Sequence, residues 1–152
     1  SLGTYAWAQR KSGVGVVVVT SDKKILLQKE YRYIIKEYSW EIQGGGVDEH
    51  ESLEDAALRE LREETGIEAP LIEKIGVFYP LNSFNTEQVT LFLAKTDIEA
   101  NSSRAQTEVS EGISEYKYVT FDEALNMIDT GQIIDALTAN AIQIVVRRLS
   151  GI

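Results

Sequence analysis

Short runs of apolar and β-branched residues, separated by polar turns, occupy much of the chain, and this alternation is typical of a β-sheet. The run Gly13–Thr20 is rich in valine and is followed by the polar turn Ser21-Asp22-Lys23 and a second apolar run, so the two runs predict a hairpin. On the same criteria the pattern predicts strands in five segments: Gly13–Thr20, Lys24–Lys29, Leu71–Tyr79, Gln88–Lys95 and Tyr116–Val119.

A helix is predicted over Leu53–Thr65, where apolar residues recur every three or four positions. Ser52 precedes this helix as an N-cap, and Asp55 three residues later completes a capping-box pattern. Gly66 follows at the position where a left-handed C-cap residue would fall. Both ends of this helix are therefore marked in the sequence.

Two further helices are predicted near the end of the chain. Thr120 and Glu123 form a second capping-box pattern, which opens a helix that continues to Asp129 and ends at Gly131. The last helix spans roughly Ile134–Arg148, with apolar residues at helical spacing. The order of strands, helix, strands, helix and helix predicts an α+β fold in which helices and a sheet form layers.

The helix over residues 53–65 has an apolar arc beside an acidic arc. Its apolar arc contains Leu53, Ala57, Leu58 and Leu61. Its acidic arc contains Glu60, Glu63 and Glu64, with Ala56 between them. Carboxylates three and four positions apart repel one another, so solvent, Arg59 or Arg62, or a bound cation must relieve the repulsion.

The clustered carboxylates have two possible interpretations, a cation site or a solvated helix face. Hard oxygen ligands suit Mg²⁺ or Mn²⁺, whereas a solvated helix face with alternating charge needs no ligand at all. Gly44, Gly45 and Gly46 lie shortly before the helix and allow the backbone to come close to a ligand. These glycines favour the cation site over the solvated face.

Length and composition place the chain among globular proteins. It has 152 residues, of which 43% are hydrophobic, so we expect residues 1–152 to form a single domain, with Ser1 and Leu2 resembling a cloning remnant. The absence of cysteine excludes disulfides, thiolate metal sites and a cysteine nucleophile. The longest apolar runs are far shorter than the ~20 residues that span a bilayer, and no signal peptide is visible. We therefore expect no membrane partner and a cytoplasmic location.

The formal net charge of −9 argues against a nucleic-acid-binding surface, which requires clustered lysine and arginine. It does not argue against a small phosphorylated substrate, because a bound cation can supply positive charge at the site. The sole histidine, His50, lies between two glutamates in a polar turn, so a Ser-His nucleophilic pair is not expected. Metal-assisted attack by water is the favoured chemistry.

The glycines and the acidic helix together carry a family resemblance. The specified positions are Gly45, Glu51, Arg59, Glu60, Leu61, Glu63, Glu64, Gly66 and Ile67. This pattern is similar to the Nudix box at every position, and it implies a hydrolase that cleaves a nucleoside diphosphate linked to another moiety. The resemblance also implies an α/β/α sandwich around a mixed central β-sheet.

The resemblance assigns roles to residues of the box. It implies that Glu60, Glu63 and Glu64 hold Mg²⁺ or Mn²⁺ together with the carbonyl of Gly44. Arg59 would orient a glutamate through a salt bridge. Glu63 is also a candidate for the catalytic base if the base lies within the box.

Segments outside the box resemble the ADP-ribose pyrophosphatase branch of the family. The similar segments are Gln28–Arg32, Trp40-Glu41, Phe78–Pro80, Thr90–Ala94 and Gly131–Thr138. The resemblance implies that Arg32 and Glu41 contribute to the substrate region, and the aromatic Tyr31 beside Arg32 is a candidate for stacking on a base. The chain departs from the branch at Gln43 and Gly44, where that branch usually has proline and a small residue.

The same branch implies a water-activating glutamate on a loop outside the box. The polar segment Asp97–Gly112 predicts a long loop, and Glu108, Glu111 and Glu115 are the candidates in its region. Counting back from the Thr120 cap places Glu111 nearest the expected position. The alternative is an acidic solvated loop with no catalytic role.

Three functions remain open from the sequence. The favoured one is hydrolysis of ADP-ribose or a related nucleotide sugar to a nucleoside monophosphate and a sugar phosphate. The others are a house-cleaning pyrophosphatase for nucleoside triphosphates and a catalytically silent domain that senses a nucleotide. Relatives of the ADP-ribose type imply a homodimer that exchanges N-terminal strands, an exchange that the short N-terminus here would reduce.

Overall fold

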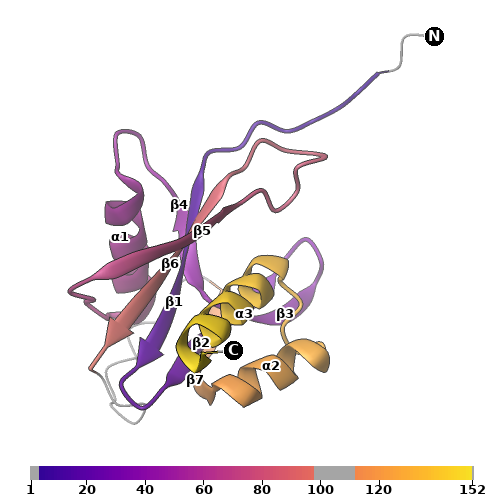
Figure 1. Cartoon of the computed structure of the whole chain (residues 1–152). Coiled ribbons are helices and arrows are strands. Elements are labelled where there is room, and N and C mark those ends of the chain that lie inside the picture. Colours follow the sequence, from indigo (N-terminus) through magenta and orange to yellow (C-terminus); the bar gives the residue numbers. More distant parts are fainter. Residues whose placement is uncertain (1–3, 98–111, 152) are drawn as a thin grey trace.

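A mixed β-sheet lies between helix α1 on one face and helices α2 and α3 on the other (Figure 1). The computed structural model describes residues 4–97 and 112–151. Its strands are β1 (Gly13–Thr20), β2 (Lys24–Arg32), β3 (Glu37–Glu41), β4 (Gln43–Gly46), β5 (Ile72–Phe78), β6 (Val89–Thr96) and β7 (Ile113–Thr120). Its helices are α1 (Leu53–Thr65), α2 (Phe121–Asp129) and α3 (Ala136–Ser150). The predicted α/β/α sandwich with a mixed central sheet is confirmed.

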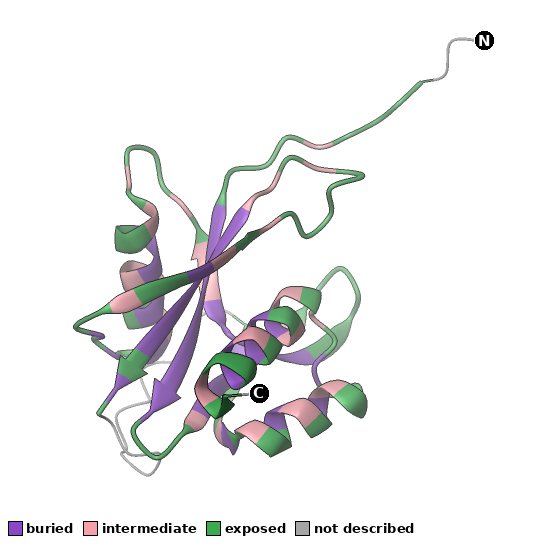
Figure 2. Ribbon diagram, in the orientation of Figure 1, coloured by how far each residue is buried: buried purple, intermediate pink, exposed green. Residues whose placement is uncertain are grey.

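Strand β1 is the centre of the sheet and is buried along its whole length (Figure 2). Its side chains alternate between the two faces, as strand geometry requires. Val16 and Val18 belong to the core beneath α1, whereas Val17 and Val19 belong to the core beneath α2 and α3. β1 runs parallel to β6 and antiparallel to β2 and β4, so this one strand organises both layers.

The sheet forks beside β1. The registered pair Val19↔Ile25 joins β1 to β2, while the other end of β1 pairs with β4 from Gly13↔Gly46 to Val16↔Gln43. Beyond the fork β2 pairs with β3 instead, and Ile42 carries the chain from β3 into β4. The fork leaves an opening between the β1–β4 branch and the β2–β3 branch, and residues of both branches line it.

The caps that the sequence predicts for α1 are present. The Ser52 hydroxyl oxygen accepts a hydrogen bond of 3.0 Å from the Asp55 amide, and Gly66 adopts a left-handed conformation with φ of 69°. The Asp55 carboxylate accepts a bond of 2.7 Å from the Ser52 hydroxyl, whereas a full capping box would direct it to the Ser52 amide. Ala56, expected within the acidic arc, is fully buried and packs in the core.

The two C-terminal helices follow the predictions with small shifts. The capping box of α2 is complete, because the Glu123 amide donates to the Thr120 hydroxyl at 3.2 Å and the Thr120 amide donates to the Glu123 carboxylate at 2.8 Å. Helix α3 begins two residues later than predicted, since Asp135 is its N-cap and accepts a 2.7 Å bond from the Thr138 amide.

Strands β3 and β4 were not predicted from the pattern. β3 is short and its alternation, Glu-Tyr-Ser-Trp-Glu, includes only two aromatic residues, while β4 is mostly glycine, so the strand signal of both is weak. β2 extends to Arg32 because its end pairs with β3. The loop predicted at Asp97–Gly112 falls almost wholly on residues 98–111, which lie outside the described residues. None of the helices in the described part of the chain is both long enough and apolar enough to cross a membrane.

Gly44 is the point of closest approach between β4 and β1. A Cβ atom at this position would overlap the Val14 carbonyl oxygen and lie 2.9 Å from the Gly15 Cα atom. Both are backbone atoms, which cannot move without breaking the β1–β4 pairing. Position 44 therefore has to be glycine for this pairing to form.

We expect Gly44→Ala to lower the free energy of unfolding by about 1–3 kcal/mol, because the added methyl group forces two backbones apart. Gly46→Ala is the matched control, since no atom lies within 4 Å of a Cβ at that position, and its effect should stay below about 1 kcal/mol. Urea denaturation of both variants measures the difference. Equal stability of the two variants would contradict the steric argument.

Candidate active site

Helix α1 presses two of its carboxylates against the glycine strand β4. A Cβ atom on Gly45 would lie 2.6 Å from Oε2 of Glu60, so this carboxylate occupies space that any other residue would fill. The Gly44 amide donates a hydrogen bond of 3.0 Å to Oε2 of Glu64. Glycine at both positions therefore allows two glutamates of one helix to contact the backbone of β4.

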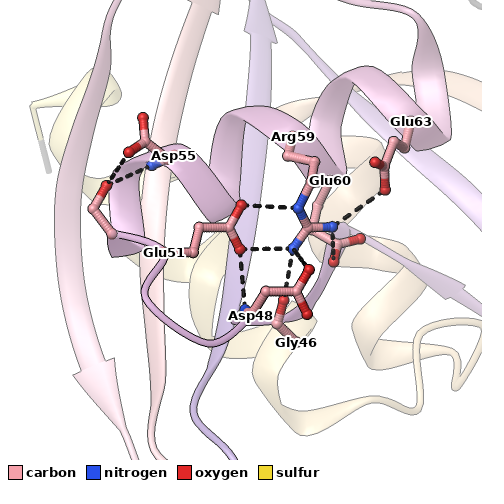
Figure 3. Close-up of polar contacts among 8 residues, drawn as sticks. Gly46, Asp48, Glu51, Asp55, Arg59, Glu60 and Glu63 are labelled. Carbon is pink, nitrogen blue, oxygen red and sulfur yellow. Dashed lines mark hydrogen bonds and ion pairs between the residues drawn. The ribbon is translucent and has the colours of Figure 1, made fainter.

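Arg59 gathers the carboxylates around it (Figure 3). Its Nε and Nη2 atoms bind the two oxygens of Glu51, each at 2.9 Å, and Nη2 also donates to the Gly46 carbonyl at 3.0 Å. Its Nη1 atom binds Glu60 at 2.9 Å and Glu63 at 3.2 Å. One guanidinium thereby ties the loop before α1 to the acidic face of the helix.

This ion pairing shifts the titration of the groups involved. Hydrogen bonds from Arg59, followed by the bond from the Asp48 amide, lower the pKa of Glu51 to about 2. Hydrogen bonding to Glu51 raises the pKa of Arg59 above its ordinary value, against the opposing effect of burial. Glu51 therefore stays ionised under all ordinary conditions and keeps Arg59 in place.

Glu64 lies in a less polar environment than the other box glutamates. Burial raises its pKa to about 7, against hydrogen bonds from the Gly44 amide and the Gln28 side chain, and the negative charges of Glu60 and Glu30 raise it further. The Tyr116 hydroxyl donates to the backbone carbonyl of Glu64 and fixes this turn of α1. A cation would stabilise the ionised form of a buried carboxylate that lies beside other carboxylates.

The third box glutamate points elsewhere. The Glu63 side chain is 56% exposed and contacts Arg59, so it does not contact the glycine strand as Glu60 and Glu64 do. Within residues 4–97 and 112–151, no three acidic or histidine side chains already stand close enough together to hold one ion. The oxygen donors nonetheless suit a hard divalent cation, since two carboxylates and the backbone of β4 meet at this point.

A cavity of about 570 Å³ opens at the fork of the sheet. It is lined by backbone of Gly13–Gly15 from β1 and Gly44–Gly46 from β4, and by Asp135 and Thr138 at the start of α3. The Thr138 hydroxyl oxygen accepts a 3.2 Å bond from the Ile42 amide at the apex of the fork. The glycine strand therefore contacts the box glutamates and also forms part of the cavity wall.

Arg32 and Glu41 also line this cavity. The Arg32 Nε atom donates to both Glu41 oxygens, at 3.0 and 3.2 Å, and its Nη2 atom binds Glu41 as well. Its Nη1 atom contacts Glu30 at 2.8 Å. The Glu41 side chain is only 6% exposed, whereas Arg32 is 48% exposed, so the arginine neutralises a buried carboxylate and keeps part of its surface open to the cavity.

Tyr31 does not join the cavity. Successive strand residues point to opposite faces, so Tyr31 lies on the other side of β2 from Arg32. Its ring contacts Tyr38 at 5.1 Å and Tyr33 at 5.7 Å between centroids. The structure brings Arg32, Glu41 and Gly44 to one cavity but leaves Tyr31 outside it.

Several residues of this region had no role predicted from the sequence. Gln28 and Gln43 are almost completely buried, and the Gln43 Nε2 atom donates to the Gln28 Oε1 atom at 3.4 Å. Glu30 also had no predicted role. Burial raises its pKa, and the charge of Arg32 opposes this rise. Two signals were available in the sequence. Gln28 ends the apolar run of β2, and Gln43 stands where a proline is expected.

Only one candidate for the loop base falls in the described structure. Glu115 lies on β7 opposite Lys29, with its carboxylate 3.7 Å from the lysine nitrogen. The next residue, Tyr116, contacts α1, so Glu115 points to the opposite face of the sheet. Glu108 and Glu111 lie outside the described residues.

Comparison with known proteins identifies the family. The NUDIX domain model matches residues 9–139. An ADP-ribose pyrophosphatase of Bacillus subtilis (strain 168) is 35% identical over 130 residues, covering 86% of this chain and 69% of that protein. A putative 8-oxo-dGTP diphosphatase of the same strain is 39% identical over 95 residues, covering 62% of this chain and 60% of that protein.

A solved structure supports the fold independently. The crystal structure of an ADP compounds hydrolase matches with a TM-score of 0.72 and 20% sequence identity, covering 91% of this chain and 74% of the other. The family resemblance inferred from residues 45–67 is confirmed by the sequence comparisons, and this structure shows that the fold is shared. With a family match across most of its length and a helix–glycine arrangement that fits the box, this chain belongs to the Nudix family and is a Nudix pyrophosphohydrolase.

Proposed function

We propose that this enzyme cleaves the diphosphate of ADP-ribose or a related nucleotide sugar, with a divalent cation, to give a nucleoside monophosphate and a sugar phosphate. The observation that carries this proposal is the double use of β4. Gly44 and Gly45 contact the carboxylates of α1, and the same strand lines one cavity together with Arg32. Strand β4 therefore connects the proposed cation ligands with the cavity that holds the proposed phosphate-binding group.

The dimensions and chemistry of the cavity support a nucleotide-sized ligand. A volume of about 570 Å³ lies within the usual range for small-molecule sites, which is ~300–1,000 Å³. The planar guanidinium of Arg32 suits phosphate oxygens, and its pairing with Glu41 fixes its orientation. The similarity to the ADP-ribose pyrophosphatase of Bacillus subtilis favours a nucleotide sugar as the substrate.

In the proposed mechanism Glu60, Glu64 and the Gly44 carbonyl would hold the cation, with Glu63 as a further ligand. A divalent cation would supply positive charge that polarises the phosphate and lowers the pKa of the attacking water. Arg59 keeps Glu60 in place, and Arg32 orients the diphosphate. Glu111 is the proposed base that accepts the proton of the attacking water. Any such base has to come within ~3 Å of that water.

The test of substrate class is a panel of ADP-ribose, other nucleotide sugars, dinucleoside polyphosphates and dNTPs, each assayed with Mg²⁺ and with Mn²⁺. We expect the highest kcat/KM for ADP-ribose or another nucleotide sugar. Arg32→Lys keeps the charge but removes the bidentate fork, so it should raise KM for that substrate about 10-fold. A clear preference of the parent enzyme for a dNTP would instead favour the second candidate.

That second candidate is a house-cleaning nucleoside triphosphate pyrophosphatase. The similarity to a putative 8-oxo-dGTP diphosphatase, at 39% identity over 95 residues, is the observation that supports it. Both candidates require the same cation half of the site, so they differ only in what Arg32 and the α3 end of the cavity bind.

Glu64→Gln should reduce kcat by about 100-fold or more, because it removes a ligand charge while keeping the size of the side chain. Its Mn²⁺ dissociation constant, measured by electron paramagnetic resonance of free Mn²⁺, should rise in parallel. Glu54→Gln is the matched control, since Glu54 is an exposed glutamate of the same helix. Hydrolysis by Glu64→Gln at the parent rate would overturn the metal assignment.

Glu111→Gln should lower kcat strongly while leaving the Mn²⁺ dissociation constant almost unchanged, since a water-activating base need not bind the cation. The matched variants are Glu108→Gln and Glu115→Gln. We expect little effect from Glu115→Gln, because that carboxylate pairs with Lys29 on the opposite face of the sheet. Unchanged kcat in all three variants would return the base to Glu63 or Glu51.

A further inference from the structure

Two buried side-chain amides lie between the two halves of the site. Gln28 is 1% exposed and Gln43 is completely buried. Gln43 opens β4 directly before Gly44, and Gln28 lies on β2 opposite Glu41. A buried amide is costly unless it forms hydrogen bonds, so two adjacent buried amides need a physical reason.

The contact between the amides sets the orientation of Gln28. The Gln43 Nε2 atom donates to the Gln28 Oε1 atom at 3.4 Å. The Gln28 oxygen therefore faces Gln43, and the Gln28 NH₂ group, with its two donors, faces the other way. Burial raises the pKa of Glu64 and of Glu30, and hydrogen bonding by the Gln28 side chain opposes that rise in both.

These two carboxylates belong to different halves of the site. Glu64 contacts the Gly44 amide beside the proposed cation ligands, whereas Glu30 contacts the Arg32 guanidinium at 2.8 Å. Glu30 and Glu41 share the same arginine, so the position of Glu30 affects the position of Arg32. Gln28 contacts Gln43, which directly precedes Gly44, and lies opposite Glu41 in the β2–β3 register, so it lies between the two halves.

We propose that Gln28 is a positioning residue that holds Glu64 and the Glu30–Arg32 pair in register, and that Gln43 fixes the orientation of the Gln28 amide. This inference rests on the proposed function, because it assigns Glu64 to the cation and Arg32 to the diphosphate. Gln43 occupies the position where the ADP-ribose pyrophosphatase branch usually has proline, so the contact between the two glutamines is a feature of this chain. Its effect is to make the cation site and the phosphate site depend on the same pair of side chains.

A purely structural role would give a different result on substitution. Replacing both glutamines by methionine keeps their approximate volume and leaves no amide unpaired, and such replacements of buried polar pairs are often neutral for stability. Glu64 still accepts from Gly44, and Glu30 still contacts Arg32. Loss of positioning, in contrast, weakens binding in both halves.

The experiment compares the parent enzyme with Gln28→Met/Gln43→Met in the full chain. We expect the Mn²⁺ dissociation constant to rise about 10-fold, as for other groups that orient metal ligands, and KM for the nucleotide substrate at saturating Mn²⁺ to rise as well. The midpoint of thermal unfolding without metal should change little. A dissociation constant and a KM both within twofold of the parent values would overturn the inference.

Tyr118→Phe is the matched control. Tyr118 packs on the α1 face of the sheet, and its hydroxyl, like Oε1 of Gln43, is buried without a hydrogen-bond partner among the described residues. Removing it deletes a buried polar atom outside the proposed network, so Mn²⁺ affinity and KM should not change. A rise in the Mn²⁺ dissociation constant equal to that of the double variant would also overturn the inference.

Gln43→Met alone provides a second route if the double variant does not fold. It leaves both donors of Gln28 in place and removes only the contact that orients them, so we expect a smaller rise in both constants, of about threefold. No change in either constant would overturn the role of the amides. If instead the parent enzyme binds no Mn²⁺, or Glu64→Gln binds it as well as the parent does, the proposed function itself fails.

Discussion

The close contact between helix α1 and the glycine strand β4 is the constraint on which the rest of this enzyme depends. Glu60 fills the space above Gly45, and Glu64 accepts a hydrogen bond from Gly44. This contact requires β4 to pair with β1, which in turn requires the absence of a side chain at Gly44. The carboxylates are thus held by the backbone of a strand that pairs with the fully buried β1, where movement is costly.

The electrostatic arrangement follows from the same contact. The protein carries a net charge of −9, and four of its buried or half-buried carboxylates, Glu30, Glu41, Glu60 and Glu64, gather around the fork of the sheet. Arg32 and Arg59 neutralise part of this charge, one on each side of β4. Among the described residues Glu64 pairs with no arginine, and burial raises its pKa, so a bound cation would favour its ionised form. Two arginines and one cation would balance the site without making the whole surface basic.

Much of the fold could be predicted because its signals are local. The caps at Ser52, Gly66 and Thr120 lie within a few residues of the helices that they define, and the valine run of β1 reads as a buried strand. The box residues could be assigned because a helix places i, i+3 and i+4 side chains on one side. The predicted apolar arc packs in or against the core, but the buried face is wider than predicted, since Ala56 from the acidic arc is also fully buried.

The features that could not be predicted arise from tertiary contacts. Strands β3 and β4 exist because β2 and β1 pair with them, while their own sequences carry a weak signal, since β3 has five residues and β4 is mostly glycine. The burial of Gln28 and Gln43 depends on a fork between two branches of the sheet, which no local pattern encodes. Tyr31 was assigned to the substrate through its neighbour Arg32, but alternation along a strand separates adjacent residues onto opposite faces.

The fork also determines which parts of the protein can change during evolution. On the β4 side, the space beside Gly44 and Gly45 is closed to any larger residue, so mutation there damages the protein before it can alter what is bound. The rest of the cavity lining, from β2, β3 and the start of α3, includes side chains such as Asp135 and Leu137 that no backbone contact restricts to glycine. New substrates would therefore be acquired by changes in that part of the lining, while the hydrolytic half is inherited unchanged.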